Sequence, residues 1–496
     1  MRSCIIAAAV FIAVLISYSP ARAAEDLESR LNQLDAELSR QGEIIRDQQQ
    51  TIEILTEKLD RQESRTAPTG GEEPFPSVMP AEEKAKAPAQ APLPVAVATR
   101  TDVWPPQGRG STLRLIDISM DALFAAGSST EDDESLQTLQ GGGHDPRKRG
   151  FTVQNIELSL MGAVDPYLAG ESHIIFFLDP LSGETEVELE EIFLTTQALP
   201  YGLQLEAGHF FTEFGRLNPR HPHQWHWQDQ QVINTRLFGP DGMRGPGFRL
   251  GWLTPLPWFS ELHIGAQNAN GETMASFLAS DEFFEERPIG GRPFVDRGVR
   301  TLKDLVYLAR LDNSWDLTDE VTTKLGLSGL YGPNATGPNA ETWIYGADLL
   351  VKWRPATNER GWPFLVWESE VMKRDYEAAA FFDDSDPFDI IDLPAKTLRD
   401  WGLYSQLLYG FHPGWAAGVR YEYATGSGES VGGRDDDPFR DNRQRISPLL
   451  VWHPSEFSRL RLQYNYDRAD HLEDEEAHSV WLGVEFMYGA HPAHTY

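Results

Sequence analysis

Cysteine is almost missing from this 496-residue sequence, since Cys4 is its single example. It lies within residues 1–23, which have a charged start at Arg2, an apolar run over 5–16 and a small-residue cleavage pattern at 21–23. These are the parts of a secretory signal peptide. The mature chain is therefore predicted to contain neither a thiol nor a disulfide.

Long apolar runs and basic residues are also scarce. No stretch after the signal approaches the roughly eighteen uninterrupted apolar residues of a spanning helix, so a helical membrane protein is excluded. Lys and Arg number 43 against 75 Asp and Glu, a balance that argues against a nucleic-acid partner, because nucleic-acid backbones bind clustered basic residues. Catalytic motifs such as G-x-S-x-G, a Walker-type loop or H-E-x-x-H do not occur, so the sequence does not suggest an enzyme.

A heptad pattern follows the signal. Leucine or isoleucine recurs by steps of four and three from Leu27 to Leu59, with Gln41 and Gln48 at two core positions. The pattern predicts a periplasmic α-helical coiled coil over residues 24–62, in which the polar core residues set register or chain number. A lone amphipathic helix on a domain surface is the alternative interpretation.

Residues 63–110 are rich in Pro, Ala and charge and have no apolar period, which predicts an extended linker. From residue 111 to the end, the pattern changes to short runs in which apolar and polar residues alternate. Such alternation predicts strands with one apolar and one polar face. The sixteen predicted strands lie near residues 111–127, 151–164, 171–178, 185–198, 202–214, 245–253, 260–269, 303–316, 320–331, 342–354, 362–375, 396–411, 415–425, 442–452, 457–467 and 476–488.

The connections distinguish a soluble sandwich or barrel from a membrane barrel. Short turns such as FHPG and DLTD alternate with mostly long, acidic loops, a pattern typical of outer-membrane barrels. Half of the fourteen tryptophans lie beside the short turns, as expected of an aromatic belt at a membrane interface: Trp252, Trp258, Trp315, Trp353, Trp362, Trp415 and Trp452. We therefore predict an all-β fold, a 16-stranded antiparallel transmembrane β-barrel over residues 111–496.

The barrel region resembles the sixteen-stranded bacterial outer-membrane porins, a superfamily that includes the phosphate-selective porins. The run GHFFTEFGRLNPRHPHQWHWQDQQVINTRLFGPDGMRG, from Gly208 to Gly245, is similar to a segment of porin-like proteins labelled zinc-regulated outer-membrane receptors, and the closing GAHPAHTY is similar to their tails. The resemblance implies passive transport without a cofactor, an outer-membrane location among lipids, and a homotrimer. The acidic composition departs from the basic bore expected of a phosphate channel.

Counted from the first strand, residues 216–244 form the third exterior loop, which in the porins folds into the bore and narrows it. The resemblance therefore makes this loop the pore constriction. Its predicted lining residues are Arg216, Arg220, His221, His223, His226, Asp229, Arg236, Asp241 and Arg244. The predicted lumen-facing strand residues are Arg310, Arg420, Glu422, Arg459, Arg461 and Glu485. Mixed Arg and Glu across a constriction create a transverse field that selects solutes by charge.

Three histidines of this loop raise a separate question. His221, His223 and His226, with one nearby carboxylate, would meet the ligand count of a zinc site. Their spacing matches no zinc signature, however, and the neighbouring arginines would repel a dication. Bound zinc or another divalent cation, and hydrogen-bonded loop histidines without metal, both stay open. The tail pair His491 and His494 is a weaker metal candidate of the same kind.

Three functions fit these observations. The leading prediction is a porin-like channel for passive passage of small, cationic solutes, with cation preference arising from the acidic loops. The second is an outer-membrane receptor that binds a metal ion or metal complex at the third loop. The third is a structural barrel whose periplasmic N-terminal coiled coil tethers the membrane to cell-wall material or holds a trimer together.

Overall fold

The computed structural model describes residues 116–179, 182–287, 289–385, 390–428, 437 and 439–489. The chain divides into two units, Met1–Pro94 and Val95–Tyr496, and all the described residues belong to the second. The predicted signal peptide, coiled coil and linker, and the tail histidines, lie outside the described residues.

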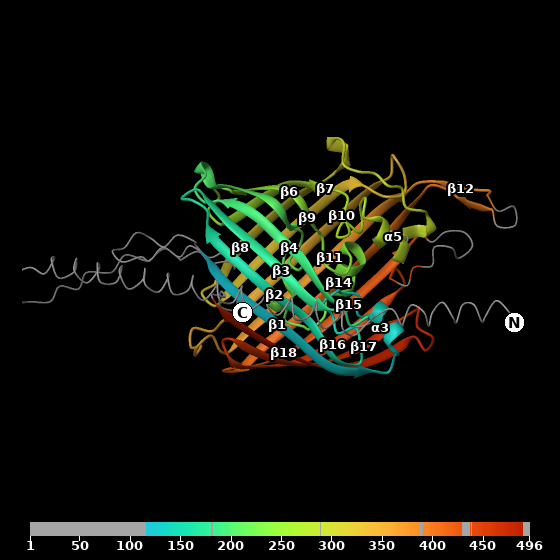
Figure 1. Ribbon diagram of the computed structural model, residues 1–496. Helices are drawn as coiled ribbons and strands as arrows, with labels where there is room; N and C mark the ends of the chain where they lie inside the picture. Colours follow the sequence, from blue (N-terminus) through green and yellow to red (C-terminus); the bar gives the residue numbers. More distant parts are fainter. Residues whose placement is uncertain are drawn as a thin grey trace, which may run out of the picture. The chain divides into compact units, whose positions relative to one another are not determined.

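Sixteen antiparallel strands close into one barrel (Figure 1), as the alternation predicted. Strands adjacent in sequence pair with each other, and the first and last strands, β1 and β18, pair to close the ring. The barrel strands are β1 (Asp117–Ser129), β2 (Gly150–Ala163), β3 (Leu168–Leu178), β4 (Thr185–Thr196), β5 (Leu203–Phe211), β6 (Arg244–Leu253), β7 (Phe259–Asn268), β8 (Leu305–Thr318), β9 (Val321–Pro333), β10 (Glu341–Trp353), β11 (Phe364–Ala378), β14 (Lys396–His412), β15 (Trp415–Ser427), β16 (Arg443–Ser455), β17 (Ser458–Ala469) and β18 (Glu476–Gly489).

The remaining elements belong to the connections between the barrel strands. The short strands β12 (Phe381–Asp383) and β13 (Ile391–Leu393) pair in a separate two-stranded sheet between β11 and β14. The helical turns are α3 (Asp133–Leu139), α4 (Val232–Phe238), α5 (Asp281–Glu286), η1 (Pro200–Gly202), η2 (Pro222–Gln224), η3 (Ile289–Gly291) and η4 (Leu302–Asp304). Among the described residues, no helix combines the length and apolarity needed to cross a membrane.

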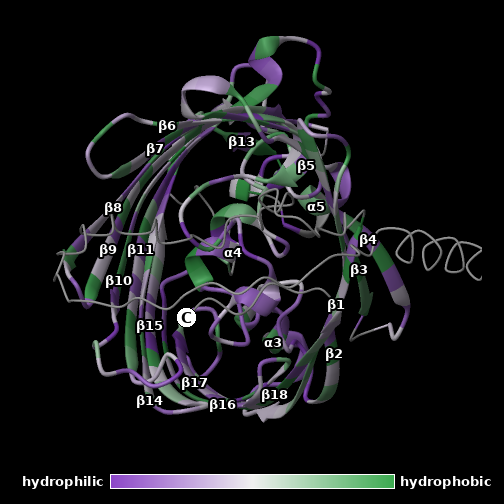
Figure 2. Cartoon of the chain, turned by 90° about the vertical axis from the view of Figure 1, so that its left-hand side faces the viewer, coloured by the Kyte–Doolittle hydropathy of each residue, from purple (hydrophilic) through white to green (hydrophobic). Residues whose placement is uncertain are grey.

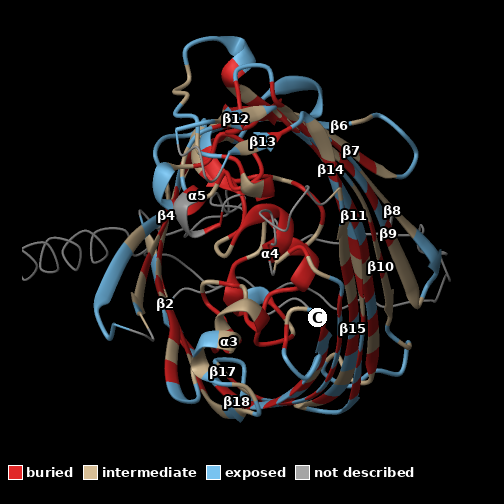
Figure 3. Ribbon diagram, turned by 90° about the vertical axis from the view of Figure 1, so that its right-hand side faces the viewer, coloured by how far each residue is buried: buried red, intermediate tan, exposed pale blue. Residues whose placement is uncertain are grey.

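Side-chain alternation gives the barrel wall an apolar outside and a polar inside. In β18, Val480 and Leu482 expose 46% and 43% of their surface, whereas the intervening Trp481 is fully buried. The same alternation of buried and exposed residues runs along β8 to β11 (Figure 3). Large apolar side chains outside and buried charges inside are the arrangement of a barrel that faces lipid.

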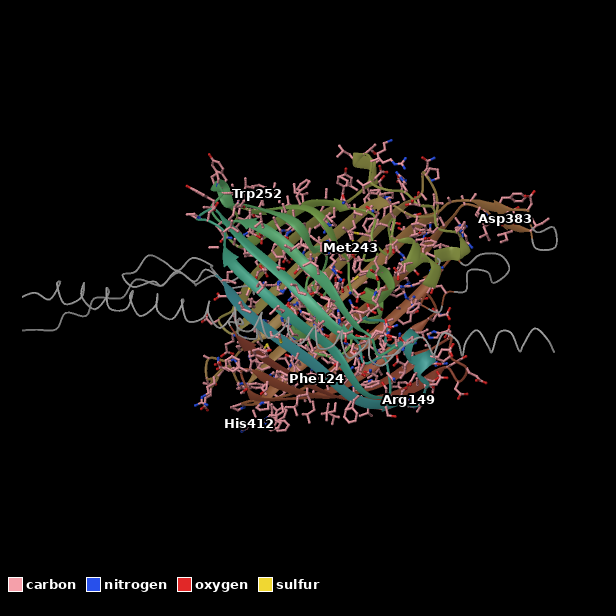
Figure 4. The ribbon with its side chains drawn as sticks, viewed as in Figure 1. Phe124, Arg149, Met243, Trp252, Asp383 and His412 are labelled. Atoms are coloured by element: carbon pink, nitrogen blue, oxygen red, sulfur yellow. The ribbon has the colours of Figure 1, made fainter. Side chains whose placement is uncertain are left out.

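Connection lengths alternate between the two rims, as predicted. Trp252 and His412 lie beside short turns on the left of Figure 4, and Arg149 and Asp383 lie in long loops on the right. Three connections on the long rim are nonetheless short: residues 179–184, 334–340 and 470–475. Trp415 and Trp452 stack near the short turns with ring centroids 5.5 Å apart.

Trp362 departs from the predicted aromatic belt. It packs against a buried cluster inside the barrel, with its ring centroid 4.8 Å from that of Phe364. Phe364 is two residues further along, faces inward and is 1% exposed. Trp362 precedes β11 and is not part of its alternation, so its packing on Phe364 and the buried cluster is what places it inside.

Candidate functional site

The connection between β5 and β6, residues 212–243, is here named L3. Both end views place its helix α4 inside the ring of strands (Figures 2 and 3), where it contacts β14 and β15. The backbone N–H of Val232, at the start of α4, donates to the Glu422 carboxylate of β15 over 2.7 Å. A loop can be buried only if its polar backbone finds partners, and the barrel wall provides this one.

Apolar packing fills the lumen around α4. Ile233, Leu237 and Phe238 of α4 lie in a buried cluster with Met274 and Phe277, which belong to the connection between β7 and β8. Wall residues complete this cluster from the inward faces of the strands: Val306, Leu308, Leu330, Ile344, Met372, Tyr404 and Ala424. Two connections and the wall thus share one hydrophobic core inside the barrel, which holds L3 in place.

Asp229 anchors L3 to one wall of the barrel. Its side chain is fully buried and forms ion pairs with Arg420 of β15 and with Arg445 of β16, the latter at 2.9 Å between Nη1 and Oδ2. Gln463 and Asn465 of β17 donate amide N–H groups to the same carboxylate, each over 2.8 Å. Burial alone would raise the pKa of Asp229, but the two guanidinium groups outweigh it and hold the pKa below its ordinary value.

The same wall holds the backbone of L3 through further arginines. Arg459 donates to the carbonyls of His223 and Trp225 over 2.8 and 3.0 Å, and Arg461 donates to the carbonyl of Trp227 over 2.9 Å. Arg459 and Arg461 both pair with Glu485 as well. We call this arginine-rich side of the lumen, on β15 to β17, the basic wall.

Trp227 packs L3 against the basic wall. Its indole N–H donates to the Ser447 carbonyl over 2.9 Å, and the Arg420 guanidinium lies 5.5 Å from the ring centroid. Its buried apolar neighbours are Leu350, Phe364, Val366, Leu408, Ala416, Leu449 and Val451. Trp225 is 7% exposed and donates its indole N–H within the loop, to the Arg220 carbonyl over 3.1 Å.

His221 meets a second side of the lumen, on β2 to β4, which we call the acidic wall; β18 and β1 separate it from the basic wall. Its Nδ1 lies 2.7 Å from Glu190 Oε2 and 3.3 Å from Glu157 Oε2, and its Nε2 lies 2.9 Å from Glu191 Oε2. Burial alone would lower the pKa of His221, but the carboxylates of Glu157 and Glu190 raise it well above its ordinary value. L3 therefore presents an imidazole to three buried carboxylates.

Two more histidines surround Glu157. His223 Nδ1 lies 3.0 Å from Glu157 Oε2, and His173 Nδ1, on β3, lies 2.8 Å from Glu157 Oε1. The rings of His173 and His221 approach to 4.4 Å between centroids. We call this group, which lies against β2 to β4, the histidine–carboxylate cluster; its members are Glu157, His173, Glu190, Glu191, His221 and His223.

A β-bulge brings Glu190 and Glu191 to the inside together. The register of β4 against β3 shifts between His173 and Ile174, so Glu191 pairs with His173 and Leu189 pairs with Ile174, which leaves Glu190 as the extra residue. Both glutamates are buried, at 1% and 6% exposure. A regular strand would send one of two successive side chains outward, so the bulge is what doubles the negative charge here.

His226 is not part of this cluster, contrary to the three-histidine group predicted from the sequence. Its ring is edge-on to Trp227 with centroids 6.5 Å apart. The turn η2 ends at Gln224, and the extended backbone of the capping residue Trp225 (φ −77°, ψ 145°) separates His226 from the turn. The histidine that joins His221 at Glu157 is instead His173 of the wall, and Glu157, His173 and His221 are placed to offer three metal-ligand atoms.

The other predicted L3 residues make ion pairs or loop contacts. Arg216 and Arg220 both pair with buried Glu368 of β11, over 3.2 and 3.0 Å, so they are neutralised there and do not lie at the histidines. Arg236 donates to the carbonyls of Arg440 and Asp441.

The last two predicted constriction residues, Asp241 and Arg244, contact a connection and a strand respectively. Arg244, the first residue of β6, pairs with Glu188. Asp241 Oδ1 lies 3.9 Å from Nε2 of His144, in the connection between β1 and β2.

The predicted lumen residues of the strands are all buried on the inward face, at 0% to 3% exposure. Arg420 pairs with Glu422, and Arg310 pairs with Asp348 at 2.7 Å. The sequence interpretation missed the carboxylates of the acidic wall and His173. Two signals were available in the sequence. The consecutive glutamates Glu190 and Glu191 break the alternation of β4, and Glu157 and His173 occupy inward-facing positions of their strands.

Comparison with known proteins finds a relative in sequence but no matching family model. No family model matches the chain. An uncharacterized protein of Aquifex aeolicus (strain VF5) is 29% identical over 405 residues, which cover 77% of this chain and 80% of that protein.

Solved outer-membrane barrels are more distant in sequence. The channel DcaP of Acinetobacter baumannii has a TM-score of 0.47 and 10% identity, over 75% of this chain and 97% of that one. OprB of Pseudomonas putida has a TM-score of 0.45 and 10% identity, over 75% and 94%. An anion-selective porin from Comamonas acidovorans has a TM-score of 0.43 and 9% identity, over 75% and 99%. The proposals below rest on the residues of this chain.

Proposed function

We propose that the protein is a porin-like channel in the outer membrane for passive passage of small, charged solutes, with L3 as its constriction. The observation that carries the proposal is a sixteen-stranded closed barrel with an apolar outside and a charged inside, crossed by a buried loop that contacts two oppositely charged walls. A lipid-facing exterior requires a membrane, and a charged interior favours water and polar solutes over lipid.

The two walls supply a transverse field. Carboxylates dominate the acidic side on β2 to β4, and guanidinium groups dominate the basic wall on β15 to β17. Fixed charges of opposite sign on two sides of a narrow, low-dielectric space orient passing water and polar molecules. Selection by charge and dipole is what this arrangement can perform without a cofactor.

Several charged side chains inside the barrel keep part of their surface accessible, which supports a water-filled path beside L3. Arg220 retains 22%, Glu213 26% and Asp312 19% of side-chain exposure. Glu171 on the acidic side retains 21%. Solutes passing L3 would therefore meet both signs of charge.

Cation preference is the part of the proposal that depends on the loops. The long-rim connections carry clusters such as Glu131 to Glu134 and Glu473 to Glu476, which raise the local concentration of cations at that rim. Lys324 and Lys352 lie at diagonal positions on the inward faces of β9 and β10, where their positive charge would reduce the preference for cations. The entrance is expected to outweigh these two lysines, because its acids are more numerous.

Reversal potentials in planar bilayers under a salt gradient test this proposal. The full chain should form channels that prefer cations, and the double substitution Lys324→Gln with Lys352→Gln should strengthen the preference. The matched double substitution of exposed Arg149→Gln and Arg468→Gln should change it less. Anion preference in the unmodified chain would refute the cation proposal, and failure to conduct at all would refute the channel.

Orientation, oligomeric state and tethering are part of the same proposal. Because β1 begins and β18 ends at the short-turn rim, we place that rim and the preceding N-terminal segment in the periplasm. The homotrimer and the contact with cell-wall material remain predictions from the sequence. Removal of residues 24–62 should affect assembly or envelope integrity without changing single-channel conductance.

A further inference from the structure

The strongest unexplained feature of the lumen is the excess of negative charge at the histidine–carboxylate cluster. Glu157, Glu190 and Glu191 belong to the cluster, and two further carboxylates join them there. Glu171 Oε1 lies 3.0 Å from His173 Nε2, and Asp121 of β1 stands directly opposite Glu157 in the strand register. Five carboxylates thus surround three imidazoles, and an excess of two negative charges remains even when every imidazole carries a proton.

Asp121 is the clearest sign that a positive charge belongs here. The residue is 2% exposed, and neither of its carboxylate oxygens has a hydrogen-bond partner among the described residues. A buried carboxylate without a partner is costly. Arg459 is the nearby guanidinium, but it donates to Glu485 and to the L3 backbone.

A second place where buried polar atoms have no hydrogen-bond partner among the described residues lies between L3 and the bulge of β4. His221 Nδ1 and Glu190 Oε2 are only 2.7 Å apart, yet neither atom takes part in a hydrogen bond among the described residues. The imidazole nitrogen and the carboxylate oxygen are near each other without a proton aligned between them. Two ligand atoms that share an ion, with no proton aligned between them, fit this observation.

The donor atoms are spaced for a metal ion. Ligand atoms of Glu157, His173 and His221 all lie within 4.8 Å of one another, and Glu190 Oε2 is adjacent. Tetrahedral ligands at zinc–nitrogen and zinc–oxygen bond lengths lie about 3.3 Å apart, so small side-chain shifts suffice. Imidazole with carboxylate suits zinc and its neighbours in the transition series, whereas calcium and magnesium prefer oxygen alone.

We propose that Glu157, His173 and His221, with Glu190 as a fourth ligand, bind one divalent transition-metal ion of the zinc class. His223 lies outside the ligand set and orients Glu157 through its Nδ1, and Asp121 adds negative charge beside the site. Because three ligands belong to the wall and His221 belongs to L3, the ion clamps L3 to the acidic wall. This site goes beyond the channel function, which requires no metal.

Zinc titration of the full chain in detergent micelles, followed by calorimetry, tests the site. We expect about one tight site per chain, and His173→Asn should weaken it at least about 100-fold, since even partners of the ligands contribute 10–100-fold. The hydrogen bonds of His173 go to the wall residues Glu157, Ser159 and Glu171, so the substituted barrel should still fold. His226→Asn is the matched control within L3 and should bind zinc like the unmodified chain.

Cobalt gives an independent readout. Co²⁺ in place of zinc should show the visible absorption of a tetrahedral site with nitrogen and oxygen ligands, and this absorption should disappear in Glu157→Gln and in His221→Asn. Zinc binding that survives His173→Asn and Glu157→Gln would lie elsewhere in the chain and overturn the assignment. Loss of zinc binding in His226→Asn to the same extent as in His173→Asn would also overturn the assignment. A complete absence of zinc binding in the unmodified chain would overturn it as well.

Single-channel conductance in the presence of a chelator separates this site from the proposed function. If the chain conducts but binds no zinc, the channel proposal is supported and the metal-site proposal is refuted. If the chain binds zinc as predicted but never conducts, the metal-site proposal is supported and the channel proposal is refuted.

Discussion

The two ends of the segment from His221 to Asp229 contact two different walls of the barrel by opposite chemistry. At one end, imidazoles of L3 meet carboxylates of the acidic wall; at the other, a carboxylate of L3 meets guanidinium groups of the basic wall. Arginine keeps its charge at every physiological pH, so the Asp229 contact is permanent. Imidazole can gain a proton, lose it or bind a metal, so the His221 contact is adjustable.

Asp229→Ala should have the largest effect, because it removes the buried carboxylate that Arg420 and Arg445 share and leaves each arginine with one other carboxylate, Glu422 or Asp467. Breaking a buried ion pair typically costs about 3–5 kcal/mol. We expect a loss of that size in the free energy of unfolding, measured by urea titration of the refolded barrel. Asp229→Asn keeps the shape of the side chain but removes its charge, so it separates the effect of the lost charge from the effect of lost packing. A loss under about 1 kcal/mol in Asp229→Ala would show that the basic wall does not hold L3.

Trp227→Ala should be next in size, since it removes an aromatic side chain that is 1% exposed and packs against the basic wall. Truncation of a buried aromatic residue costs about 3 kcal/mol or more, and relaxation of the loop would reduce this toward the lower limit. The urea midpoint should fall accordingly. Trp452→Ala is the control, because that tryptophan is 41% exposed on the outside. Equal losses in the two variants would contradict the bracing role of Trp227.

His221→Ala should cost less, about 1–3 kcal/mol in metal-free buffer, because Glu190 and Glu191 lose a buried partner but can take up protons themselves. Urea titration with a chelator measures the loss. His226→Ala should be close to neutral, since that histidine is only half-buried and lies outside the cluster. A larger loss in His226→Ala than in His221→Ala would reverse the comparison between the two histidines.

The smallest expected effect is local and depends on pH. Burial and the carboxylate of Asp229 raise the pKa of Asp145, in the connection between β1 and β2, to about 7. The folded state therefore holds a proton that the unfolded state releases near pH 4, so the contribution of Asp145 to stability falls as pH rises from about 4 to 7. Gln230 N–H donates to this side chain over 2.8 Å, so L3 is affected.

Hydrogen exchange of the amides of residues 140–146, corrected for the intrinsic effect of pH, measures this local change. Protection should be lower at pH 8 than at pH 5 in the unmodified chain. Asp145→Asn has no titrating proton at this position, so its protection should vary less. Protection that varies equally in both chains would assign the pH dependence to other groups.

The sequence predicts the barrel well because its signals are local. Alternation of apolar and polar residues specifies which side chains face outward, and turn residues specify where strands end. The inward parity of Arg459, Arg461 and Glu485 followed from this alternation alone. Trp362 is the informative failure, since its position beside a turn suggested the belt, whereas its packing on Phe364 and the buried cluster places it inside.

The candidate site was only partly predictable, because its partners come from distant strands. The sequence identified His221 and Asp229 as L3 residues but could not show that they meet different walls. His173 and Glu157 are 48 and 64 residues away from His221 along the chain, and no spacing rule connects them to it. Only the bulge at Glu190 had a local signal, and it becomes meaningful once the strand register is known.

The sequence by itself determined the class of fold, the number of strands and the faces of the wall, because hydrophobic alternation acts over a few residues. The tertiary structure decided the pairing of charges inside the barrel: which histidine joins Glu157, which arginines hold Asp229, and how Arg216 and Arg220 are neutralised by Glu368. The physical reason is that a closed barrel brings residues from separate strands and from L3 into one low-dielectric space, where buried charges require partners.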